Sequence, residues 1–456
     1  MNNMVDQYFR SLKGKQVAVL GIGISNRPLI KMLLSYGIHT VACDRTTREA
    51  LDEEVLELEK AGAVLKLGEA YLADLSADVV FRTPGMHPNI PALTELREQG
   101  AVITSEMEAF FEVCPCKIIA VTGSDGKTTT TTLIAEILKH AGKRVWIGGN
   151  IGQPLLPLAE HMTHDDIAVV ELSSFQLMNM KYSAHIAVVT NLAPNHLDVH
   201  KDMAEYIDAK KNIYLHQNSD DRLIINLDNE ITAAFASEAK GKTAGFSRKA
   251  RPTDGAYLEE DTILYNGVPV MMREDILLPG IHNVENYMAA LCAVYELADF
   301  SDVKSVAANF GGVEHRIELV RTVNGVRYYN DSIASSPTRT IAGLHAFDQK
   351  IILIAGGYDK QIPFDVLGPE IIAHVKQLIL CGATADKIKE AVLSSPEYCG
   401  SPKIQIVENL EEAVRVAHTL AQSGDIVSLS PACAAFDQFK NFMVRGKVYK
   451  ELINAL

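Results

Sequence analysis

The sequence predicts an α/β protein of three domains whose sheets are mostly parallel. Short apolar runs recur along the chain, and most of them end in a Gly-rich or polar turn that leads into a segment with helical spacing. Strands that alternate with helices in this way are typical of parallel sheets covered on both faces. A chain of 456 residues is also too long for a single hydrophobic core, since a domain holds roughly 150 residues. We therefore expect domains over residues 1–106, 107–312 and 313–456.

The composition is ordinary for a globular protein, with 47% hydrophobic and 22% charged residues. No apolar run approaches the ~18 residues of a membrane span, and the start of the sequence resembles no export signal. Seven scattered cysteines fit reduced thiols in a cytosol. The formal net charge of −14 argues against a nucleic-acid surface. We expect a cytoplasmic monomer that acts on small molecules, without nucleic acid and without membrane insertion.

The first domain opens with a βαβ pattern and is expected to be Rossmann-like. An apolar strand at residues 17–20 runs into the turn GIGIS at residues 21–25, and the next strand ends at Asp44. An acid about 20 residues beyond such a turn belongs to a nucleotide-binding fingerprint, in which it holds a ribose hydroxyl. Asn26 replaces the third Gly of that pattern, which disfavours a dinucleotide. The alternative is a Rossmann-like domain that binds nothing in its crevice.

The central domain is organised around VTGSDGKTTTTT, residues 121–132, between an apolar strand and a helical pattern. Backbone N–H groups and the helix dipole at such a turn attract anions. Lys127 adds a point charge for phosphate, and the Thr128 hydroxyl can ligate Mg²⁺. Five consecutive threonines are poor helix formers, so we expect a bound ligand to stabilise this turn. These features predict a phosphate-loop ATPase-type domain; the alternative is an ordinary Gly-containing turn.

Two further polar side chains follow strands of the same predicted sheet. Glu171 ends the apolar run at residues 167–170, and His196 follows the run at residues 186–190. Ligands of open α/β sheets bind beyond the carboxyl ends of strands. A carboxylate one strand away from a phosphate loop is a usual Mg²⁺ ligand. The alternatives are a helix N-cap acid for Glu171 and a structural role for His196.

Two pairs of residues on predicted helices remain ambiguous from their pattern alone. Lys210 and Lys211 are adjacent, and by charge they form a solvated helix face. Asn283 and Asn286 are three residues apart and therefore share one helical face. The two asparagines could equally be N-terminal capping residues.

The third domain is predicted to be a second Rossmann-like α/β domain that starts with a hairpin. Its two strands, at residues 318–322 and 327–330, are joined at Asn324-Gly325, a strong hairpin signal. Further apolar strands follow, each ending in a Gly or polar turn, at residues 351–354, 377–380 and 426–429.

Eight segments carry a more specific signal: TGSDGKTTT, GGNIG, ELSSFQL, NLAPNHLD, HNVENYMAA, EHRIE, NDSIASSP and SPACAAFDQFKNFMVRG. In this order they resemble the Mur ligases of peptidoglycan synthesis, and they cover nearly the whole chain. The resemblance implies an ATP-dependent ligase that adds D-glutamate to UDP-N-acetylmuramoyl-L-alanine through an acyl phosphate. Alternatives are an L-alanine-adding ligase, a folylpolyglutamate-type synthetase, or a nucleotide-binding regulator without catalysis.

The resemblance also implies roles for individual residues. ATP is expected to contact Gly123, Ser124, Asp125, Gly126, Lys127, Thr128, Thr129, Asn283, His315, Arg316 and Asp331. Two Mg²⁺ ions are expected at Thr128, Glu171, His196 and a carbamylated Lys210. Catalysis is expected to depend on Lys127, His196 and Lys210. The other substrates are expected to contact Ile24, Ser25, Asp44, Arg45, Gly85, Asn150, Ser173, Ser335, Lys360 and Phe442.

Three positions depart from the D-glutamate-adding members of the family. Ile333 stands where those enzymes have Lys, Ser335 where they have Thr, and Ala435 where a Ser touches the substrate's side-chain carboxylate. The loss of a cation and a hydroxyl weakens a dicarboxylate site unless another residue replaces them. Arg339, within a helical turn or two of Ile333, is our candidate for the missing charge.

Overall fold

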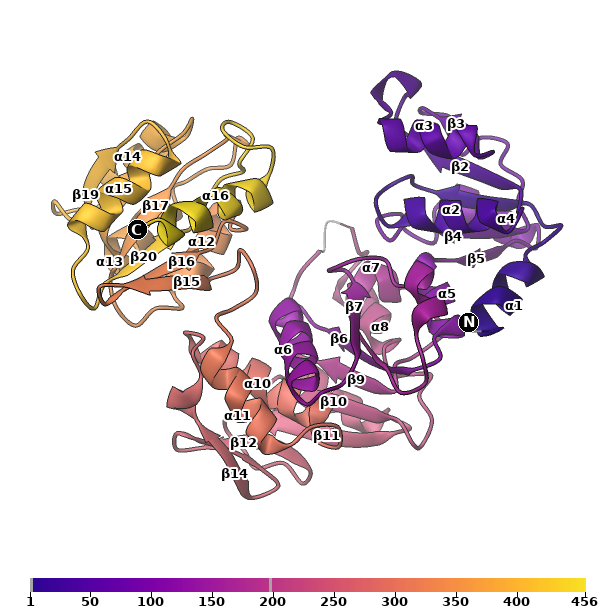
Figure 1. Ribbon diagram of the computed structural model, residues 1–456, viewed down its shortest axis with the longest axis horizontal. Coiled ribbons are helices and arrows are strands. Elements are labelled where there is room, and N and C mark those ends of the chain that lie inside the picture. The colour runs from indigo at the N-terminus through magenta and orange to yellow at the C-terminus, as the bar shows by residue number, and fades with distance from the viewer. Residues whose placement is uncertain (1–2, 197–198) are drawn as a thin grey trace. The chain divides into compact units, whose positions relative to one another are not determined.

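The computed structural model describes residues 3–196 and 199–456, so the last two residues of NLAPNHLD, Leu197 and Asp198, lie outside the described residues (Figure 1). The described strands form three sheets, and the chain divides into two compact units. One unit runs up to Arg273 and includes Glu285–Val306; the other comprises Glu274–Val284 and Ala307–Leu456. The predicted α/β class with mostly parallel sheets is confirmed, while the domain boundaries at residues 106 and 312 stay a prediction. Among the described helices, none is long and apolar enough to cross a membrane.

The first sheet is parallel throughout and has the order β3-β2-β1-β4-β5. Its strands are β1 (Val17–Leu20), β2 (Thr40–Asp44), β3 (Val64–Leu67), β4 (Val79–Arg82) and β5 (Val102–Thr104). One face packs against α1 (Asn3–Ser11), α2 (Asn26–Ser35) and α3 (Glu53–Lys60), and the other against α4 (Pro91–Glu98). The strand order reverses direction between β1 and β4, which is the point where such sheets bind ligands.

The second sheet has the order β14-β13-β12-β11-β10-β9-β6-β8-β7 and is antiparallel only at β12-β13 and β13-β14. Its strands are β6 (Lys117–Thr122), β7 (Val145–Gly149), β8 (Ile167–Glu171), β9 (Ile186–Val189), β10 (Arg222–Asn226), β11 (Lys242–Ser247), β12 (Gly255–Glu259), β13 (Thr262–Tyr265) and β14 (Val268–Met272). The segment of residues 240–275, which holds β11 to β14, extends the sheet. Its strands are short, but each has buried residues that anchor it to its neighbours.

The helices around the second sheet are α5 (Glu106–Val113), α6 (Lys127–His140), α7 (Ser174–Leu177), α8 (Met203–Lys211), α9 (Glu230–Ala234), α10 (Ile281–Val294) and α11 (Phe300–Asn309). Short 3-10 helices occur at Arg48–Ala50, Leu156–His161, Phe235–Ser237 and Arg273–Asp275. Phe9 of α1 and Phe110 of α5 belong to one buried apolar cluster, so the cores of the first two sheets are continuous. The five threonines lie within α6, where Thr130 and Thr131 are fully buried. Their packing overrides their poor helix propensity.

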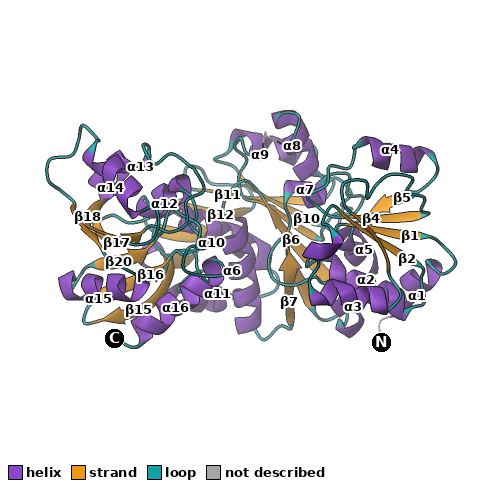
Figure 2. Cartoon of the chain, turned by 90° about the horizontal axis from the view of Figure 1, so that it is seen from above, coloured by secondary structure: helices purple, strands orange, loops and turns teal. Residues whose placement is uncertain are grey.

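The third sheet has the order β15-β16-β20-β17-β18-β19 and is parallel except for the β15-β16 hairpin. Its strands are β15 (Glu318–Val323), β16 (Val326–Asn330), β17 (Ile351–Ala355), β18 (Val375–Leu380), β19 (Lys403–Ile406) and β20 (Ile426–Leu429). The hairpin turns at Asn324 and Gly325, both with positive φ, as predicted. Figure 2 shows α12 (Pro337–Leu344), α13 (Leu367–His374) and α14 (Ala385–Leu393) on one side of this sheet, and α15 (Leu410–Leu420) and α16 (Phe442–Asn454) on the other.

A buried carboxyl group lies where the chain passes from the first sheet to the second. Glu106, the first residue of α5, accepts a hydrogen bond from the Leu156 N–H at 2.9 Å. Burial raises the pKa of this carboxyl to about 7, against the opposing effect of that hydrogen bond. The folded protein therefore retains a proton that the unfolded chain, with a pKa near 4.5, has lost. Between these two values, the Glu106 contribution to stability falls as pH rises.

Glu106→Gln should remove this pH dependence, because the amide keeps an acceptor oxygen for Leu156 but does not ionise. We expect the free energy of unfolding of the wild type, relative to the variant, to fall by about 1–3 kcal/mol between pH 4.5 and pH 8. Urea denaturation at several pH values measures this difference. Glu98→Gln, at the exposed end of α4, is the matched control. Parallel stability profiles for the wild type and Glu106→Gln would contradict the prediction.

Candidate active site

The predicted phosphate loop connects β6 to α6 at the carboxyl edge of the second sheet. Gly123 and Gly126 have φ values of +150° and +77°. A Cβ at Gly123 would lie 1.9 Å from Thr190 Oγ1, and one at Gly126 would lie 2.5 Å from Asn286 Oδ1. Both positions therefore require glycine, for conformation and for space. The loop backbone is packed closely against the end of β9 and against α10.

Side chains outside the motif hold the loop in this conformation. Ser124 Oγ donates to the Ala193 carbonyl at 2.9 Å and lies 3.0 Å from the Tyr206 hydroxyl. Thr190 Oγ1 donates to the Asp125 carbonyl at 2.6 Å. The sequence analysis missed Thr190 and Tyr206, because neither belongs to a phosphate-loop pattern. Tyr206 lies one helical turn before Lys210 in α8, so the two side chains share a helical face. This spacing could have indicated that Tyr206 lies near the loop.

Lys127 lies at the start of α6, with its ammonium folded over the loop. Its Nζ donates to the carbonyls of Gly123 at 3.0 Å and Ser124 at 2.8 Å. Thr129, two residues further along α6, is half-buried. A lysine cation and the N-terminal end of a helix thus meet at the same loop, which is an arrangement suited to anionic phosphate.

Glu171, at the end of β8, joins three segments of the second sheet region. One carboxylate oxygen accepts the Thr128 hydroxyl at 2.7 Å, and the other accepts the Asn150 amide at 2.8 Å. The Glu171 side chain is only 1% exposed. The Glu171 carboxylate and the Thr128 hydroxyl offer oxygen ligands that fit a hard cation such as Mg²⁺. The structure therefore brings together three of the residues that the sequence analysis selected.

Ser173 is the N-cap of α7, so the alternative interpretation of Glu171 as an N-cap acid is wrong. The Ser173 hydroxyl accepts the Gln176 N–H at 3.3 Å, and the Gln176 side chain accepts the Ser173 N–H at 3.0 Å. This capping box fixes the segment that follows Glu171.

Lys210 is buried beneath the loop, which contradicts the interpretation of a solvated face drawn from charge alone. Its Nζ donates to Thr122 Oγ1 at 3.1 Å and to the Gly123 carbonyl at 2.9 Å, and it lies 4.9 Å from the centre of the Tyr206 ring. Burial, with a further contribution from the Lys127 charge, lowers the pKa of Lys210 well below its usual value. Lys211, in contrast, pairs with Glu238 at 2.8 Å.

His196 lies on the loop after β9, with a φ of +55° and an exposed side chain. Its ring meets the Phe175 ring edge-on, with centroids 5.1 Å apart. Phe175 also stacks on the buried ring of His200, at 5.2 Å and an interplanar angle of 4°. The ELSSFQL segment thus supports the predicted metal ligand His196 through its aromatic residue.

A buried arginine connects the first sheet to this same segment. Arg82, at the end of β4, donates to the carbonyls of Met86 at 3.0 Å, Phe175 at 3.0 Å and Met178 at 2.9 Å. Burial lowers the pKa of its guanidinium to about 10. Sequence analysis missed Arg82, since nothing in the residues around β4 indicates a partner almost a hundred positions away.

The predicted nucleotide residues of the first domain lie at the carboxyl ends of β1, β2 and β4, beside the reversal of strand order. They are Ile24, Ser25, Asp44, Arg45 and Gly85. Burial by itself would raise the pKa of Asp44. The hydrogen bonds that its carboxylate accepts from Thr46 and Ile22 outweigh this effect, so the pKa is lowered. The Ile22 bond, at 2.7 Å, ties Asp44 to the GIGIS turn. Ile24, 82% exposed, and Arg45 remain open to solvent.

The remaining predicted residues belong to the second compact unit. They are Asn283 in α10, His315 and Arg316 before β15, Asp331 after β16, Ser335 before α12, Lys360 after β17, and Phe442 at the start of α16. Asn283 donates from its side chain to the Pro279 carbonyl at 2.6 Å, while Arg316 and Lys360 are exposed.

His315, Asp331 and Phe442 gather around a buried polar network. His315 Nδ1 accepts the Asn330 amide at 2.9 Å, and its ring meets Phe442 edge-on at 6.0 Å. Asp331 accepts the Ser430 hydroxyl at 2.7 Å, and burial raises the pKa of this carboxyl to about 7. Burial also lowers the pKa of His315. The uncharged forms of both groups are thus favoured relative to water.

Arg445, another residue that the sequence analysis missed, holds α16 against this network. Its guanidinium donates to the carbonyls of Ser332 at 2.9 Å, Cys433 at 3.0 Å and Ala434 at 3.1 Å. Burial lowers its pKa to about 10. Like Arg82, it is held by neutral carbonyl oxygens.

Comparison with known proteins gives matches over the whole chain. The Mur ligase middle domain matches residues 121–294, and the Mur ligase, glutamate ligase domain matches residues 315–433. The chain is 51% identical over 464 residues to the UDP-N-acetylmuramoylalanine--D-glutamate ligase of Acetivibrio thermocellus, and 51% identical over 458 residues to the Clostridium novyi protein of the same name. Both comparisons cover 100% of each chain.

A solved structure supports the same fold. The crystal structure of UDP-N-acetylmuramate-alanine ligase from Thermotoga maritima matches with a TM-score of 0.58 and 18% identity, over 97% of this chain and 99% of that one. At this identity the likeness concerns the fold alone. The full-length relatives, which are 51% identical to this chain, show more than the fold. The chain belongs to the Mur ligase family.

Proposed function

We propose that this protein is an ATP-dependent ligase that adds D-glutamate to UDP-N-acetylmuramoyl-L-alanine. The observation that carries the proposal is the cluster of Thr128, Glu171 and Lys210 around the phosphate loop, in a chain whose full-length relatives bear that name. ATP phosphorylates the substrate's terminal carboxylate with release of ADP, and the D-glutamate amine attacks the acyl phosphate. The tetrahedral intermediate then expels phosphate and leaves an amide. The seven cysteines, all free thiols, suit an enzyme of the reducing cytosol.

Charge stabilisation is the main requirement of phosphoryl transfer. Loop N–H groups and Lys127 would receive the ATP phosphates, since the loop is already fixed by Ser124 and Thr190. Thr128 and Glu171 would hold one Mg²⁺ through their adjacent oxygens. His196, at the same edge of the sheet, would hold a second. When bound, these ions neutralise phosphate charge.

The burial of Lys210 supports its proposed carbamylation. The lowered pKa favours the neutral amine, whose nitrogen can attack CO₂ to form a carbamate with release of one proton. The new group would replace a buried amine with an anion and supply an oxygen ligand for Mg²⁺. The hydrogen bond from Lys210 to the Gly123 carbonyl supports a role for this ligand at the phosphate loop.

The nucleotide-sugar substrate would use the edge of the first sheet. Ile24, Ser25, Asp44, Arg45 and Gly85 would contact the uridine diphosphate, because they surround the point where ligands of such sheets bind. Asn150 and Ser173, which flank Glu171, would contact the muramoyl-alanine end.

The amino-acid pocket would be built by the second unit, from Ser335, Lys360 and Phe442. Ile333 replaces the expected lysine there. Arg339 Nη1 donates to the Ile333 carbonyl at 3.4 Å, which places a guanidinium beside the altered position. We propose that Arg339 binds a carboxylate of D-glutamate. Asn283, His315, Arg316 and Asp331, in the same unit, would contact ATP.

Phosphate release from ATP with UDP-N-acetylmuramoyl-L-alanine tests the proposed reaction. We expect turnover with D-glutamate and none with L-glutamate, D-aspartate, L-alanine or glycine. Reactions without an amine are the control, since an acyl phosphate alone gives no sustained turnover. Turnover only with L-alanine or another amino acid would place the enzyme at a different step. Absence of turnover with every amine would favour the non-catalytic regulator.

Lys210→Ala should lower kcat by about 10²–10³-fold, because it removes a charged group that acts on the transferring phosphoryl. Lys211→Ala is the matched control, and we expect its kcat within about twofold of the wild type, since Lys211 pairs with Glu238. In ¹³C-bicarbonate, a carbamate NMR signal should appear in the wild type and in Lys211→Ala. A carbamate signal that persists in Lys210→Ala would exclude carbamylation at this residue.

Arg339→Ala should raise the KM for D-glutamate about tenfold or more while kcat changes little, because a charge-assisted hydrogen bond to a carboxylate is lost. Steady-state kinetics with D-glutamate titrated at saturating ATP and nucleotide-sugar measure this change. Arg415→Ala, an exposed arginine of α15 on the other face of the third sheet, serves as the control. An unchanged KM in Arg339→Ala would remove Arg339 from the pocket.

A further inference from the structure

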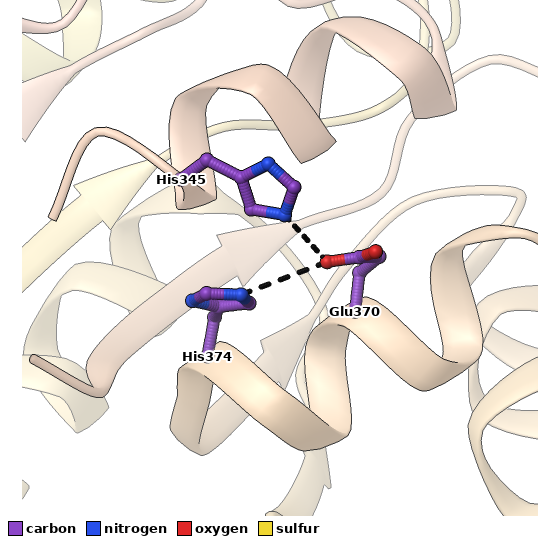
Figure 3. Close-up of side chains that lie close together, drawn as sticks. All are labelled: His345, Glu370 and His374. Carbon is purple, nitrogen blue, oxygen red and sulfur yellow. Dashed lines mark hydrogen bonds and ion pairs between the residues drawn. The ribbon is translucent and has the colours of Figure 1, made fainter. Parts of the chain in front are cut away.

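Two histidines and a glutamate that the proposed reaction does not use converge on the surface of the third sheet region (Figure 3). His345 is the C-cap residue of α12, while Glu370 and His374 lie on α13. Figure 3 shows the three side chains pointing toward one another from these two helices. The cluster is built entirely within the second compact unit.

The geometry of the cluster is that of three possible metal-ligand atoms around one point. Nε2 of His345 lies 2.6 Å from Glu370 Oε2, and Nε2 of His374 lies 3.6 Å from the same oxygen. The three ligand atoms all lie within 4.8 Å of one another. Glu370 and His374 are four residues apart, so one helical face presents both. His345 closes the group from a separate helix.

The electrostatics of the two helices also favour a cation here. His345 caps the C-terminal end of α12, and His374 is the last residue of α13. The C-terminal end of a helix carries a partial negative charge. Lys350 already donates to the Ile372 carbonyl at this end of α13, at 2.9 Å, but it bonds the backbone and not the Glu370 carboxylate.

Access and ligand type narrow the class of ion. The side chains of His345, Glu370 and His374 are 51%, 32% and 31% exposed, so an ion can enter from solvent and keep a water ligand. Two imidazole nitrogens with one carboxylate oxygen form a set known for zinc. Imidazole ligands suit zinc and related transition metals, whereas Mg²⁺ prefers oxygen ligands.

We propose that His345, Glu370 and His374 form a binding site for one divalent cation of the zinc class, with water in the fourth position. The site would join α12 to α13 across the surface of the sheet. These helices follow the segments that carry Ser335 and Lys360. Bound metal would therefore restrain both segments of the proposed amino-acid pocket. That consequence rests on the proposed function, whereas the metal site does not.

Isothermal titration of the full-length protein with Zn²⁺ tests the site without any assay of activity. Excess Mg²⁺ competes with Zn²⁺ for the oxygen ligands at the phosphate loop, and a non-chelating reductant keeps the cysteines as thiols. We expect one Zn²⁺ to bind the wild type at this cluster. His345→Ala and His374→Ala should each weaken that binding at least about tenfold, because each removes one direct ligand. His164→Ala, a solvent-exposed histidine next to Asp165, should bind like the wild type.

Thermal melting provides the second readout and controls for folding. In EDTA, the variants should melt at temperatures close to that of the wild type, since the three side chains are partly exposed and are not part of the hydrophobic core. Zn²⁺ should raise the melting temperature of the wild type and of His164→Ala, but not that of Glu370→Gln, which preserves the side-chain shape. Equal Zn²⁺ affinity in the wild type, His345→Ala and His374→Ala would overturn the proposal. Absence of Zn²⁺ binding by the wild type would also overturn it and would leave an ion-pair cluster.

Discussion

The structure of the site depends on one buried side chain, that of Lys210, whose amine lies beneath the phosphate loop. Taking such a group out of water is costly, and here the Thr122 hydroxyl and the Gly123 carbonyl offset part of that cost. The same two residues form the end of β6 and the start of the loop. The last turn of α8, the end of β6 and the loop are consequently bound to each other through a single nitrogen. Any change in the charge of Lys210 acts directly on the loop backbone.

Glu171 supplies the anionic group of the same site. It is buried, and its two oxygens are each held by a neutral donor, from Thr128 and Asn150. Neutral donors orient the carboxylate without cancelling its charge. The negative charge thus remains available to a cation at a fixed position, which is the preorganisation that phosphoryl transfer requires.

Local sequence patterns were sufficient for the elements whose signals lie within a few residues. The phosphate loop, the βαβ unit ending at Asp44 and the hairpin at Asn324-Gly325 belong to this group. The burial of Lys210 could not be read from charge, because it depends on where α8 packs; only the family resemblance pointed to it. Tyr206 was missed for the same reason, and Asn286 was noted only for the helical face it shares with Asn283. Both reach the loop from helices that are distant in the sequence.

Arg82 and Arg445 extend this point, because each binds carbonyls from segments that are far apart in the chain. The fork of N–H donors on a guanidinium matches several carbonyls at once, whereas a lysine ammonium cannot reproduce that geometry. For Arg82, the carbonyls belong to the turn after β4 and to α7 with its following residue. We therefore expect these two segments to coevolve. A substitution that reshapes either of them changes the fitness effect of substitutions in the other. Lineages of this protein should therefore carry paired changes there, or none.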